Sequence, residues 1–389
     1  MGKAKGYDVA VVGAGVFGVW TAYHLALRRA SVLLLDGYGP GNSRASSGGE
    51  SRIMRLGYGR DRIYSESAHR SLKQWLQLFS SKADSGREDY QYFRRTGMLW
   101  LAREVDDYCQ AVLDNLQTIG AHHEKLARAE LDKRYPQINF GPVRWAVLEN
   151  DSGVIMARRA VRAVVDEAIK LGVTFRQRSV TAVPSQLIDN SVSLDNGEAV
   201  FAERFVFACG PWLPKVFPEL LSELIHVTKQ DVFFIGPPAG NAFFDSNNFP
   251  TWIDFNDQVY GMPNLDERGF KIAIDAHGET FDPDSGERIV SKANIETVRR
   301  YVAERFPMLA NAPIIETRVC QYENTSSGDF LLDRHPAIEN VWLAGGGSGH
   351  GFKHGPAVGE YMAKLLEGGT PEPRFSLASK EKVYQRRVF

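Results

Sequence analysis

The feature that most constrains this chain is a glycine-rich turn between an apolar run and a helix-like segment near its start. Residues 9–12 are apolar, Gly13, Gly15 and Gly18 follow, and a second apolar run ends at Asp36. This order predicts strand, turn, helix and strand, with Gly13 making the tight turn and Gly15 admitting a pyrophosphate to the backbone. Gly18 lets the helix pack close to the sheet. Asp36, at the strand end, can accept hydrogen bonds from ribose hydroxyls, so the stretch predicts a dinucleotide site.

A second segment of this kind closes the chain. Residues 340–356 predict a strand and a glycine-rich loop that carries Lys353, and residues 357–366 predict a helix. Two such elements at opposite ends of the sequence indicate that both termini fold around one large cofactor. FAD fits that arrangement better than a loosely held nicotinamide, although the first fingerprint alone leaves the two open. An acid at Asp36 disfavours only the 2′-phosphate of NADP.

Composition excludes several classes of partner. The 389 residues include 46 Lys and Arg against 47 Asp and Glu, a net charge of −1. We therefore expect no nucleic acid and no anionic membrane as partner. No apolar segment has the length that spans a bilayer. Three cysteines without a close pair favour a reducing compartment, and residues 385–389 lack a peroxisomal tripeptide, so we expect a cytoplasmic protein.

The pattern along the chain predicts an α/β protein with two domains. We assign residues 1–85, 152–225 and 315–389 to a discontinuous cofactor-binding domain, and residues 86–151 and 226–314 to a substrate domain. Alternating apolar and polar residues between 227 and 274 predict antiparallel strands in the latter. Helical periodicity predicts helices over 64–81 and 291–306, and a charged helix over 125–135 that Pro136 ends.

Three candidate groups carry chemistry that the sequence alone leaves open. His350 and His354 have the spacing of a metal pair on a helix, but Gly351 intervenes and no third ligand is near, so we predict no metal site. Cys320 is either a buried small hydrophobe or a reactive thiol. Lys271 lies within an apolar strand, so it must reach solvent or have a partner in a site.

Several motifs of this chain resemble those of a known family. The amino-terminal fingerprint, Arg52–Arg55, Tyr260-Gly, Phe270-Lys271, Val319–Tyr322 and Ser348–Lys353 occur in the order of monomeric sarcosine oxidase. Relatives of that enzyme include N-methyltryptophan oxidase, pipecolate oxidase and the fructosyl amino acid oxidases. The resemblance covers nearly the whole chain. It implies an FAD-binding Rossmann-like domain of the glutathione-reductase type, and a second α+β domain on a mixed, largely antiparallel sheet, as in D-amino-acid oxidase.

The resemblance also implies roles for individual residues. Cys320 would bind the flavin covalently, Arg55 and Lys353 would clamp the substrate carboxylate, and Lys271 would lie over the flavin, where a positive charge favours the reaction with oxygen. Arg52 would lie near the flavin, and Tyr260 and Tyr322 would line the substrate pocket. The implied cofactor-binding residues are Gly13, Gly15, Gly18, Asp36, Arg44, Ser47, Val180, Cys320, Gly347, Gly349 and Lys353.

The implied reaction oxidises the carbon next to an amine nitrogen, and it uses a small amine or amino acid and O₂ on a monomeric enzyme. One position departs from the pattern. Sarcosine oxidases have a histidine four residues after the flavin-facing lysine, where this chain has Asp275. An anionic side chain repels a carboxylate and favours a cationic or polar group. We therefore expect a larger, N-substituted or glycated amino acid in place of sarcosine.

The sequence leaves three alternative functions open. The first is an FAD dehydrogenase of the same fold that passes electrons to a carrier, against which Lys271 argues. The second is a non-catalytic flavoprotein, which has no use for Arg55, Lys271, Tyr322 and Lys353 together. The third is a NAD-dependent dehydrogenase, which a visible flavin spectrum would exclude.

Overall fold

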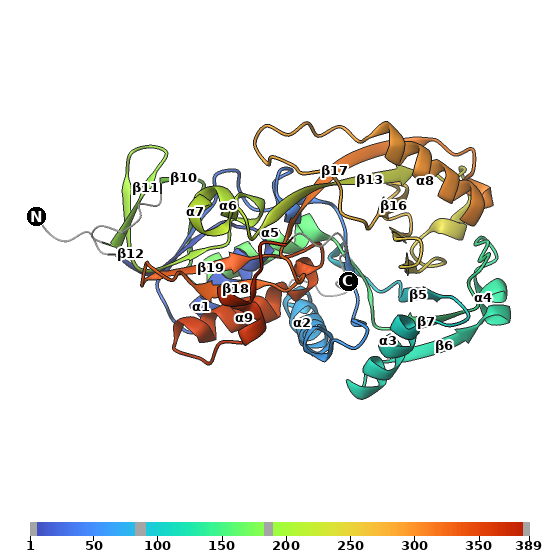
Figure 1. The fold of residues 1–389 in the computed structure, drawn as a ribbon, viewed down its shortest axis with the longest axis horizontal. Coiled ribbons are helices and arrows are strands. Elements are labelled where there is room, and N and C mark those ends of the chain that lie inside the picture. Colours follow the sequence, from blue (N-terminus) through green and yellow to red (C-terminus); the bar gives the residue numbers. More distant parts are fainter. Residues whose placement is uncertain (1–5, 82–90, 183–189, 384–389) are drawn as a thin grey trace, which may run out of the picture.

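Two sheets and a group of helices organise the chain. The computed structural model describes residues 6–81, 91–182 and 190–383. Figure 1 shows the first sheet and its helices in the left half, and the second sheet in the right half. The long strands β13 (His226–Ile235) and β17 (Ile314–Asn324) run from the middle of the molecule into the right half. The two halves therefore meet along the first residues of β13 and the last residues of β17.

The first sheet contains the parallel strands that the glycine fingerprint predicts. Its path is β10-β11-β12-β1-β2-β9, and β19 also pairs with β12 and β18. The pairs β1·β2, β1·β12, β12·β19 and β2·β9 are parallel. The strands are β1 Tyr7–Val12, β2 Val32–Leu35, β9 Thr174–Arg176, β10 Val180–Ala182, β11 Ser191–Leu194, β12 Ala199–Phe207, β18 Leu331–Arg334 and β19 Val341–Gly345.

The second sheet is mixed and largely antiparallel, as predicted. Its order is β17-β13-β16-β15-β14-β5-β7-β6, in which only the pair β14·β5 among these described strands is parallel. A small sheet, β3-β8-β4, lies apart from both. The remaining strands are β3 Arg52–Met54, β4 Phe93–Arg94, β5 Met98–Ala102, β6 His123–Ala127, β7 Trp145–Glu149, β8 Gly153–Ile155, β14 Thr251–Asp254, β15 Val259–Met262 and β16 Phe270–Ile274.

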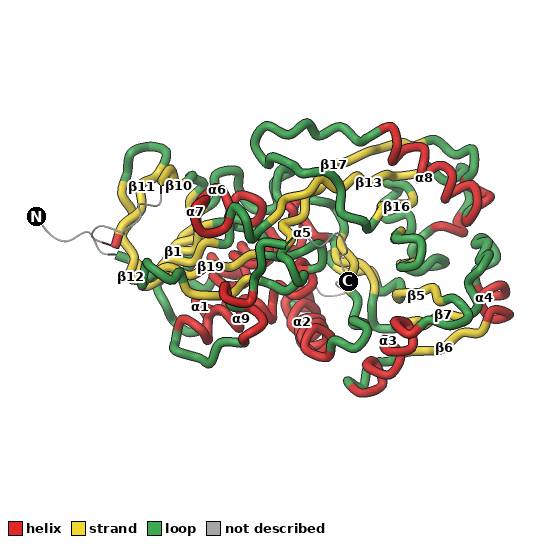
Figure 2. The backbone as a smooth tube through the Cα atoms, viewed as in Figure 1, coloured by secondary structure: helices red, strands yellow, loops and turns green. Residues whose placement is uncertain are grey.

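The helices that belong to the two ends of the chain pack together below the first sheet in Figure 2. A Cβ on Gly359 of α9 would lie 2.4 Å from the backbone of Trp20 in α1, so these helices cross at close range. Trp20 and Trp75 of α2 are buried edge to face, with ring centroids 4.9 Å apart. The helices are α1 Val16–Leu27, α2 Arg62–Ser80, α3 Asp107–Thr118, α4 Arg128–Arg134, α5 Ala157–Lys170, α6 Leu213–Val216, α7 Pro218–Leu221, α8 Lys292–Arg305 and α9 Gly355–Leu366.

This architecture confirms the predicted fold class, with two local differences. The helix predicted over 125–135 is wrong in its first part, because residues up to Ala127 pair with β7 as strand β6 and the helix begins at Arg128. Strand β17 pairs with β13 in the second sheet, although the predicted boundary puts residues from 315 in the cofactor-binding domain. Strand pairing shows which sheet each strand belongs to, but it does not test where a domain begins and ends. The predicted domain limits therefore stay a prediction.

Candidate functional site

A cavity of about 750 Å³ lies along the first sheet and reaches the last residues of β17. Cavities of roughly 300–1,000 Å³ are the usual size for small-molecule and cofactor sites. The cavity extends from the fingerprint loop to Cys320, so residues that are about 300 positions apart in sequence line one space. The predicted residues that line it are Gly13, Gly15, Asp36, Ser47, Arg52, Val180, Cys320, Tyr322, Gly347 and Gly349.

The first end of the cavity is the start of α1. Gly13 has φ +107°, and a Cβ there would lie 2.3 Å from the carbonyl oxygen of Ala208, so the turn requires glycine. The Asp36 carboxylate accepts hydrogen bonds from the amides of Ala14 at 2.8 Å and Tyr38 at 2.8 Å. Carboxylate oxygens can accept further bonds, so the Asp36 side chain remains able to bind ribose hydroxyls. Burial raises the pKa of Asp36.

Three of the predicted cofactor residues do not line the cavity. Gly18 lies behind the loop, where a Cβ would lie 1.9 Å from the carbonyl oxygen of Gly13, which fits its predicted packing role. The Arg44 guanidinium donates to the Tyr38 hydroxyl and to the carbonyl of Asp284. Lys353 points into the protein interior, as described below. The Arg44 guanidinium therefore has protein partners, and its contact with the cofactor stays a prediction.

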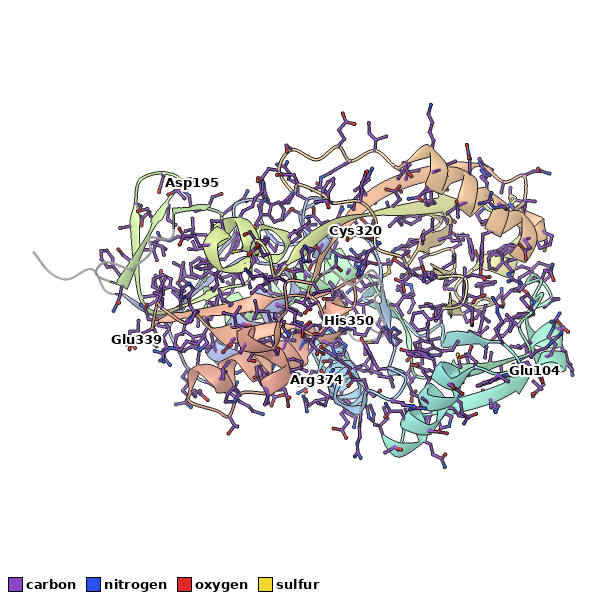
Figure 3. All side chains as sticks on the ribbon, viewed as in Figure 1. Glu104, Asp195, Cys320, Glu339, His350 and Arg374 are labelled. Atoms are coloured by element: carbon purple, nitrogen blue, oxygen red, sulfur yellow. The ribbon has the colours of Figure 1, made fainter. Side chains whose placement is uncertain are left out.

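The far end of the cavity brings together Arg52, Cys320 and Lys271. Figure 3 shows Cys320 in the middle of the molecule, where the two halves meet. Arg52 Nη2 lies 3.2 Å from Cys320 Sγ. Lys271, 4% exposed, donates to the carbonyl and the hydroxyl of Ser51 at 3.0 and 3.2 Å. Burial, followed by the charge of Arg52, holds the pKa of Lys271 well below its usual value, so its charge depends on pH.

Sequence reasoning missed a buried acid in the cavity wall. Glu323 lies three residues after Cys320 on β17, and Glu323 Oε1 accepts from the amide of Gly347 at 3.3 Å. Glu323 Oε2 has no hydrogen-bond partner among the described residues. Burial raises the pKa of the Glu323 carboxyl to about 7. Because Glu323 lines the cavity, a ligand bound there can supply the partner of Oε2.

Behind the far end of the cavity lie the two predicted carboxylate-binding cations. The Arg55 guanidinium stacks over the rings of Tyr58 at 4.2 Å and Trp100 at 5.1 Å. Lys353 belongs to a short 3₁₀ turn, Gly351–His354, and its Nζ donates to the Tyr58 hydroxyl at 2.9 Å and to the carbonyl of His350 at 2.8 Å. Arg55 and Lys353 are therefore brought together around Tyr58, and both are buried.

Glu149 is a second residue that the sequence did not indicate. Its fully buried carboxylate accepts from the amides of Leu56 at 2.7 Å and Gly57 at 2.8 Å, and from the Trp100 indole at 2.6 Å. These bonds fix the chain that follows Arg55, and Arg55 itself donates to the carbonyl of Gly57. Their partners lie 49 to 93 positions away in sequence, so no local pattern could have revealed the role of Glu149.

Asp275 lies in the same buried region as the two cations. Burial raises the pKa of the Asp275 carboxyl to about 6, while the charges of Arg55 and Lys353 act in the opposite direction. The field of Asp275 also raises the pKa values of Tyr260 and Tyr322, after the larger effect of burial, and these two tyrosines share a hydrogen bond. The Tyr322 ring packs on Gly349, where φ is +78° and a Cβ would lie 2.7 Å from the ring.

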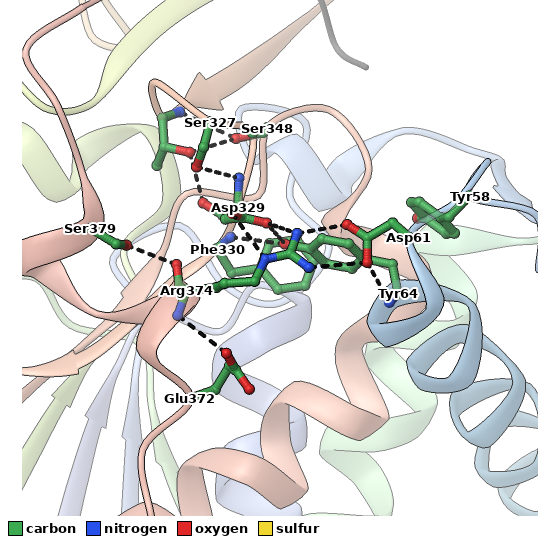
Figure 4. A network of polar contacts seen from close by, with 12 residues as sticks. Tyr58, Asp61, Tyr64, Ser327, Asp329, Phe330, Ser348, Glu372, Arg374 and Ser379 are labelled. Atoms are coloured by element: carbon green, nitrogen blue, oxygen red, sulfur yellow. Dashed lines mark hydrogen bonds and ion pairs between the residues drawn. The ribbon is translucent and has the colours of Figure 1, made fainter. Parts of the chain in front are cut away.

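A network of ion pairs holds α2 beside these residues. Arg374 bonds to Asp61 at 2.6 Å and to Asp329 at 2.6 Å, and the buried Tyr64 hydroxyl donates to Asp329 at 3.0 Å. Figure 4 shows these side chains with Tyr58 beside them. The network joins the beginning of α2 to the turn before β18 and to the C-terminal segment, so it fixes the helix that carries Tyr64, whose ring stacks on Tyr58.

Comparison with known proteins decides the family. A profile described as FAD dependent oxidoreductase matches residues 8–365. This chain belongs to the FAD-dependent oxidoreductases. The peroxisomal sarcosine oxidase of Homo sapiens is 31% identical over 375 residues, which cover 94% of this chain and 93% of the relative. The monomeric sarcosine oxidase of Bacillus sp. (strain NS-129) is 27% identical and covers 96% of both chains.

Solved structures support the fold of this FAD-dependent oxidoreductase. The L-proline dehydrogenase from P. horikoshii superposes with a TM-score of 0.80 at 20% identity, covering 96% of this chain and 98% of that one. The two sarcosine oxidases compared above confirm the resemblance that the motifs predict. The cavity fits FAD, because the glycine turn and Asp36 lie at one end and Cys320 at the other, and the wall holds a Glu323 oxygen, Oε2, without a hydrogen-bond partner among the described residues.

The compartment of this FAD-dependent oxidoreductase stays a prediction. The human relative is named peroxisomal, so a cytoplasmic location is not confirmed. Residues 385–389, on which that prediction partly rests, lie outside the described residues. Within the described ranges, none of the helices combines the length and the apolar character that crossing a membrane requires.

Proposed function

We propose that this protein is an FAD-dependent oxidase of a secondary or otherwise substituted amino acid. The reaction would remove a hydride from the carbon next to the amine nitrogen, give an imine that water hydrolyses, and reduce O₂ to H₂O₂. FAD would supply the two-electron acceptor, held from Gly13 and Asp36 to Cys320 and covalently attached at that cysteine. The observation that carries the proposal is the convergence of two buried cations, the half-buried Asp275 and the Arg52–Cys320 pair at the far end of one cofactor-sized cavity.

The side chains have complementary tasks in this proposal. Arg55 and Lys353 would bind the two oxygens of a substrate carboxylate, because two cationic donors match one anion. Tyr260 and Tyr322 would form the wall between these cations and the cavity. Lys271 would favour electron transfer to oxygen while it carries its proton. A polypeptide that only stores a flavin has no need of this set of buried charges, which cost folding free energy.

Asp275 would select the substrate within this class. An ionised Asp275 carboxylate near Arg55 and Lys353 offsets part of their positive charge. The site would then attract the carboxylate of a plain amino acid less strongly. It would attract a substrate with a second cationic or hydroxyl-rich group, which supports a substituted or glycated amino acid over sarcosine. The observation behind this step is that Asp275 shares one buried region with both cations.

A peroxide assay with a panel of amines tests the proposal. The panel contains sarcosine, cyclic amino acids, basic amino acids and N-substituted or glycated amino acids, each under air and with an artificial electron acceptor. We expect peroxide with at least one substituted amino acid, and loss of that activity in Lys353→Met. Turnover only with the artificial acceptor would contradict the oxidase assignment and favour a dehydrogenase. Absence of turnover with every compound under both conditions would contradict amine oxidation itself.

A further inference from the structure

We propose that residues 282–288 form a strap that closes the cofactor cavity and has to open for FAD exchange. These residues belong to the loop between β16 and α8, in the half of the molecule that contains the second sheet. Figure 1 shows this loop in orange, extending from the beginning of α8 toward α6 of the other half. The strap concerns entry and release of the cofactor, so it does not depend on which substrate the enzyme oxidises.

The strap is bonded to another part of the cavity wall. The Asp284 carboxylate accepts from the Trp212 indole at 2.7 Å and pairs with Lys215 Nζ at 2.6 Å. All three residues line the cavity, although Trp212 and Lys215 come from the half that contains the first sheet. Because both partners of each bond line the cavity, these bonds close its wall at this point.

The strap lies on the side of the cavity that faces solvent. Among the residues that line the cavity, Ser47 and Ala344 are buried, whereas Tyr38, Lys215 and Asp284 are exposed. The exposed residues mark where the cavity meets solvent. The bonds of Asp284 to the first half therefore cross an opening of the cavity.

Both ends of the loop are fixed to the second sheet. Before the strap, the amide of Phe281 donates to the carbonyl of Val227 in β13 at 2.9 Å, and its ring is buried with Val227 and Val319. After the strap, the amide of Ser291 donates to the Asp231 carboxylate at 2.8 Å. A movement of the residues between these anchors would therefore leave the second sheet intact.

The strap also has internal hydrogen bonds. The Asp282 carboxylate accepts from the amides of Asp284 at 2.8 Å and Ser285 at 3.0 Å. The carbonyl of Asp282 accepts from the amide of Gly286 at 2.9 Å. These bonds shape the turn without any partner from the first half, so the strap can keep its form when its contacts with α6 break.

The contacts with the first half are of a kind that breaks readily. Lys215 Nζ pairs with Asp282 at 2.7 Å and with Asp284 at 2.6 Å, and all three side chains are exposed. Exposed ion pairs contribute little to stability, and salt screens them. The Arg44 guanidinium adds an exposed bond to the carbonyl of Asp284. The bond to Lys215 holds the pKa of Asp282 well below its usual range, so salt, not neutral pH, loosens the strap.

Two variants weaken the strap at exposed positions, where folding is little affected. Lys215→Met removes the charge that both acids share, and Asp284→Asn removes one of those acids but keeps the shape of its side chain. Lys170→Met is the matched control, because it breaks an exposed pair with Glu167 and neither partner lines the cavity. Every protein also carries Cys320→Ala, so that the flavin can exchange.

FAD fluorescence measures both directions of exchange, through its quenching on binding to the apoprotein and its return on release. We expect Lys215→Met to raise both rates about tenfold, and Asp284→Asn to raise them less. The dissociation constant should change by less than about threefold, because the broken bonds join protein groups to one another. The double variant should match Lys215→Met, since the two residues share one contact.

Salt provides a second measurement on the same proteins. About 1 M NaCl should raise the release rate of the parent toward that of Lys215→Met, and should change the release rate of the variant much less. Exchange in Lys215→Met at the rates of the parent and of Lys170→Met would overturn the strap. A lower melting temperature with unchanged exchange would also overturn it, because the loop would then only hold the two halves together.

Discussion

The Arg52 guanidinium lies 3.2 Å from the sulfur of Cys320, although 268 positions separate the two residues in sequence. Arg52 also donates to the carbonyls of Ser46 and Ser51, so its position beside the sulfur is fixed. The guanidinium thus holds a positive charge beside the sulfur. We propose that this charge assists covalent attachment of a flavin at Cys320.

Covalent attachment predicts a specific effect of replacing Cys320. Acid denaturation should leave the yellow colour on the parent polypeptide and release it from Cys320→Ala. Cys209→Ala is the matched control, since Cys209 lines the same cavity and should leave attachment intact. Arg52→Met should slow attachment of FAD to the apoprotein about tenfold, because the sulfur loses the positive charge beside it. Release of all flavin from the parent protein would contradict the assignment of Cys320.

Replacing Lys271 should affect the reaction with oxygen more than substrate oxidation. We expect Lys271→Met to reduce the rate of flavin reoxidation by about 10²–10³-fold, the usual effect of removing one stabilising donor. Because burial lowers the pKa of Lys271, the parent rate should fall as pH rises, at pH values below the ordinary lysine pKa. The Met variant should show no such step. Stopped-flow mixing of reduced enzyme with oxygen measures both, and an unchanged rate would rule out this role.

The carboxyl of Asp275 should make substrate preference pH-dependent. Its pKa is raised to about 6, so it is anionic above that pH and neutral below it. For a substrate with a second cationic group, KM should rise as pH falls through about 6, and this change should be absent in Asp275→Asn. Asp275→His should shift preference toward plain N-methyl amino acids. An identical substrate profile in the parent and the His variant would contradict the role of Asp275.

Glu323 should link cofactor affinity to pH. A carboxyl with a pKa near 7 becomes anionic as pH rises, and it then repels the anionic phosphates of a dinucleotide. In the Cys320→Ala background we expect FAD affinity to fall about tenfold, or 1.4 kcal/mol, between pH 6 and 8. Glu323→Gln should remove that dependence. Fluorescence titration of the apoprotein with FAD at each pH measures this affinity. The same pH dependence with Glu and with Gln at position 323 would exclude Glu323 as the cause.

The network around Asp329 should contribute to stability. Asp329→Ala leaves the buried Tyr64 hydroxyl without its carboxylate partner and removes one partner of Arg374, so we expect a loss of about 2–3 kcal/mol. Arg62→Ala breaks an exposed pair with Glu66 on the same helix and should cost less than about 0.5 kcal/mol. Denaturant unfolding measures both. Equal effects would show that the network is no more stabilising than a surface pair.

The fold was predictable from the sequence where local geometry decides it. The fingerprint at Gly13 to Gly18 requires a tight turn and a close helix, and the structure has both. The strand status of residues 123–127 was not predictable, because pairing with β7 overrides their charged, helix-like composition. The membership of β17 in the second sheet depends on its partner β13, about 90 positions earlier, and no local pattern encodes that pairing.

Some residues of the candidate site were likewise predictable from the sequence, and others were not. Lys271 was singled out because a lysine in an apolar strand needs a partner, and the structure supplies Ser51. Glu149 was not recognised, since its role arises from bonds to Leu56 and Gly57 that form only in the folded chain. Motif spacing identifies side chains that contact a ligand, whereas the residues that position them become visible only in three dimensions.

Anaerobic titration of the purified protein with the amine panel tests the central claim most directly. If two cations and Asp275 hold an amino acid against a flavin, at least one substituted amino acid should bleach the visible flavin absorbance. Admission of air should then restore the colour with one peroxide per flavin. A colourless protein, or a flavin that none of these amines reduces, would contradict the account.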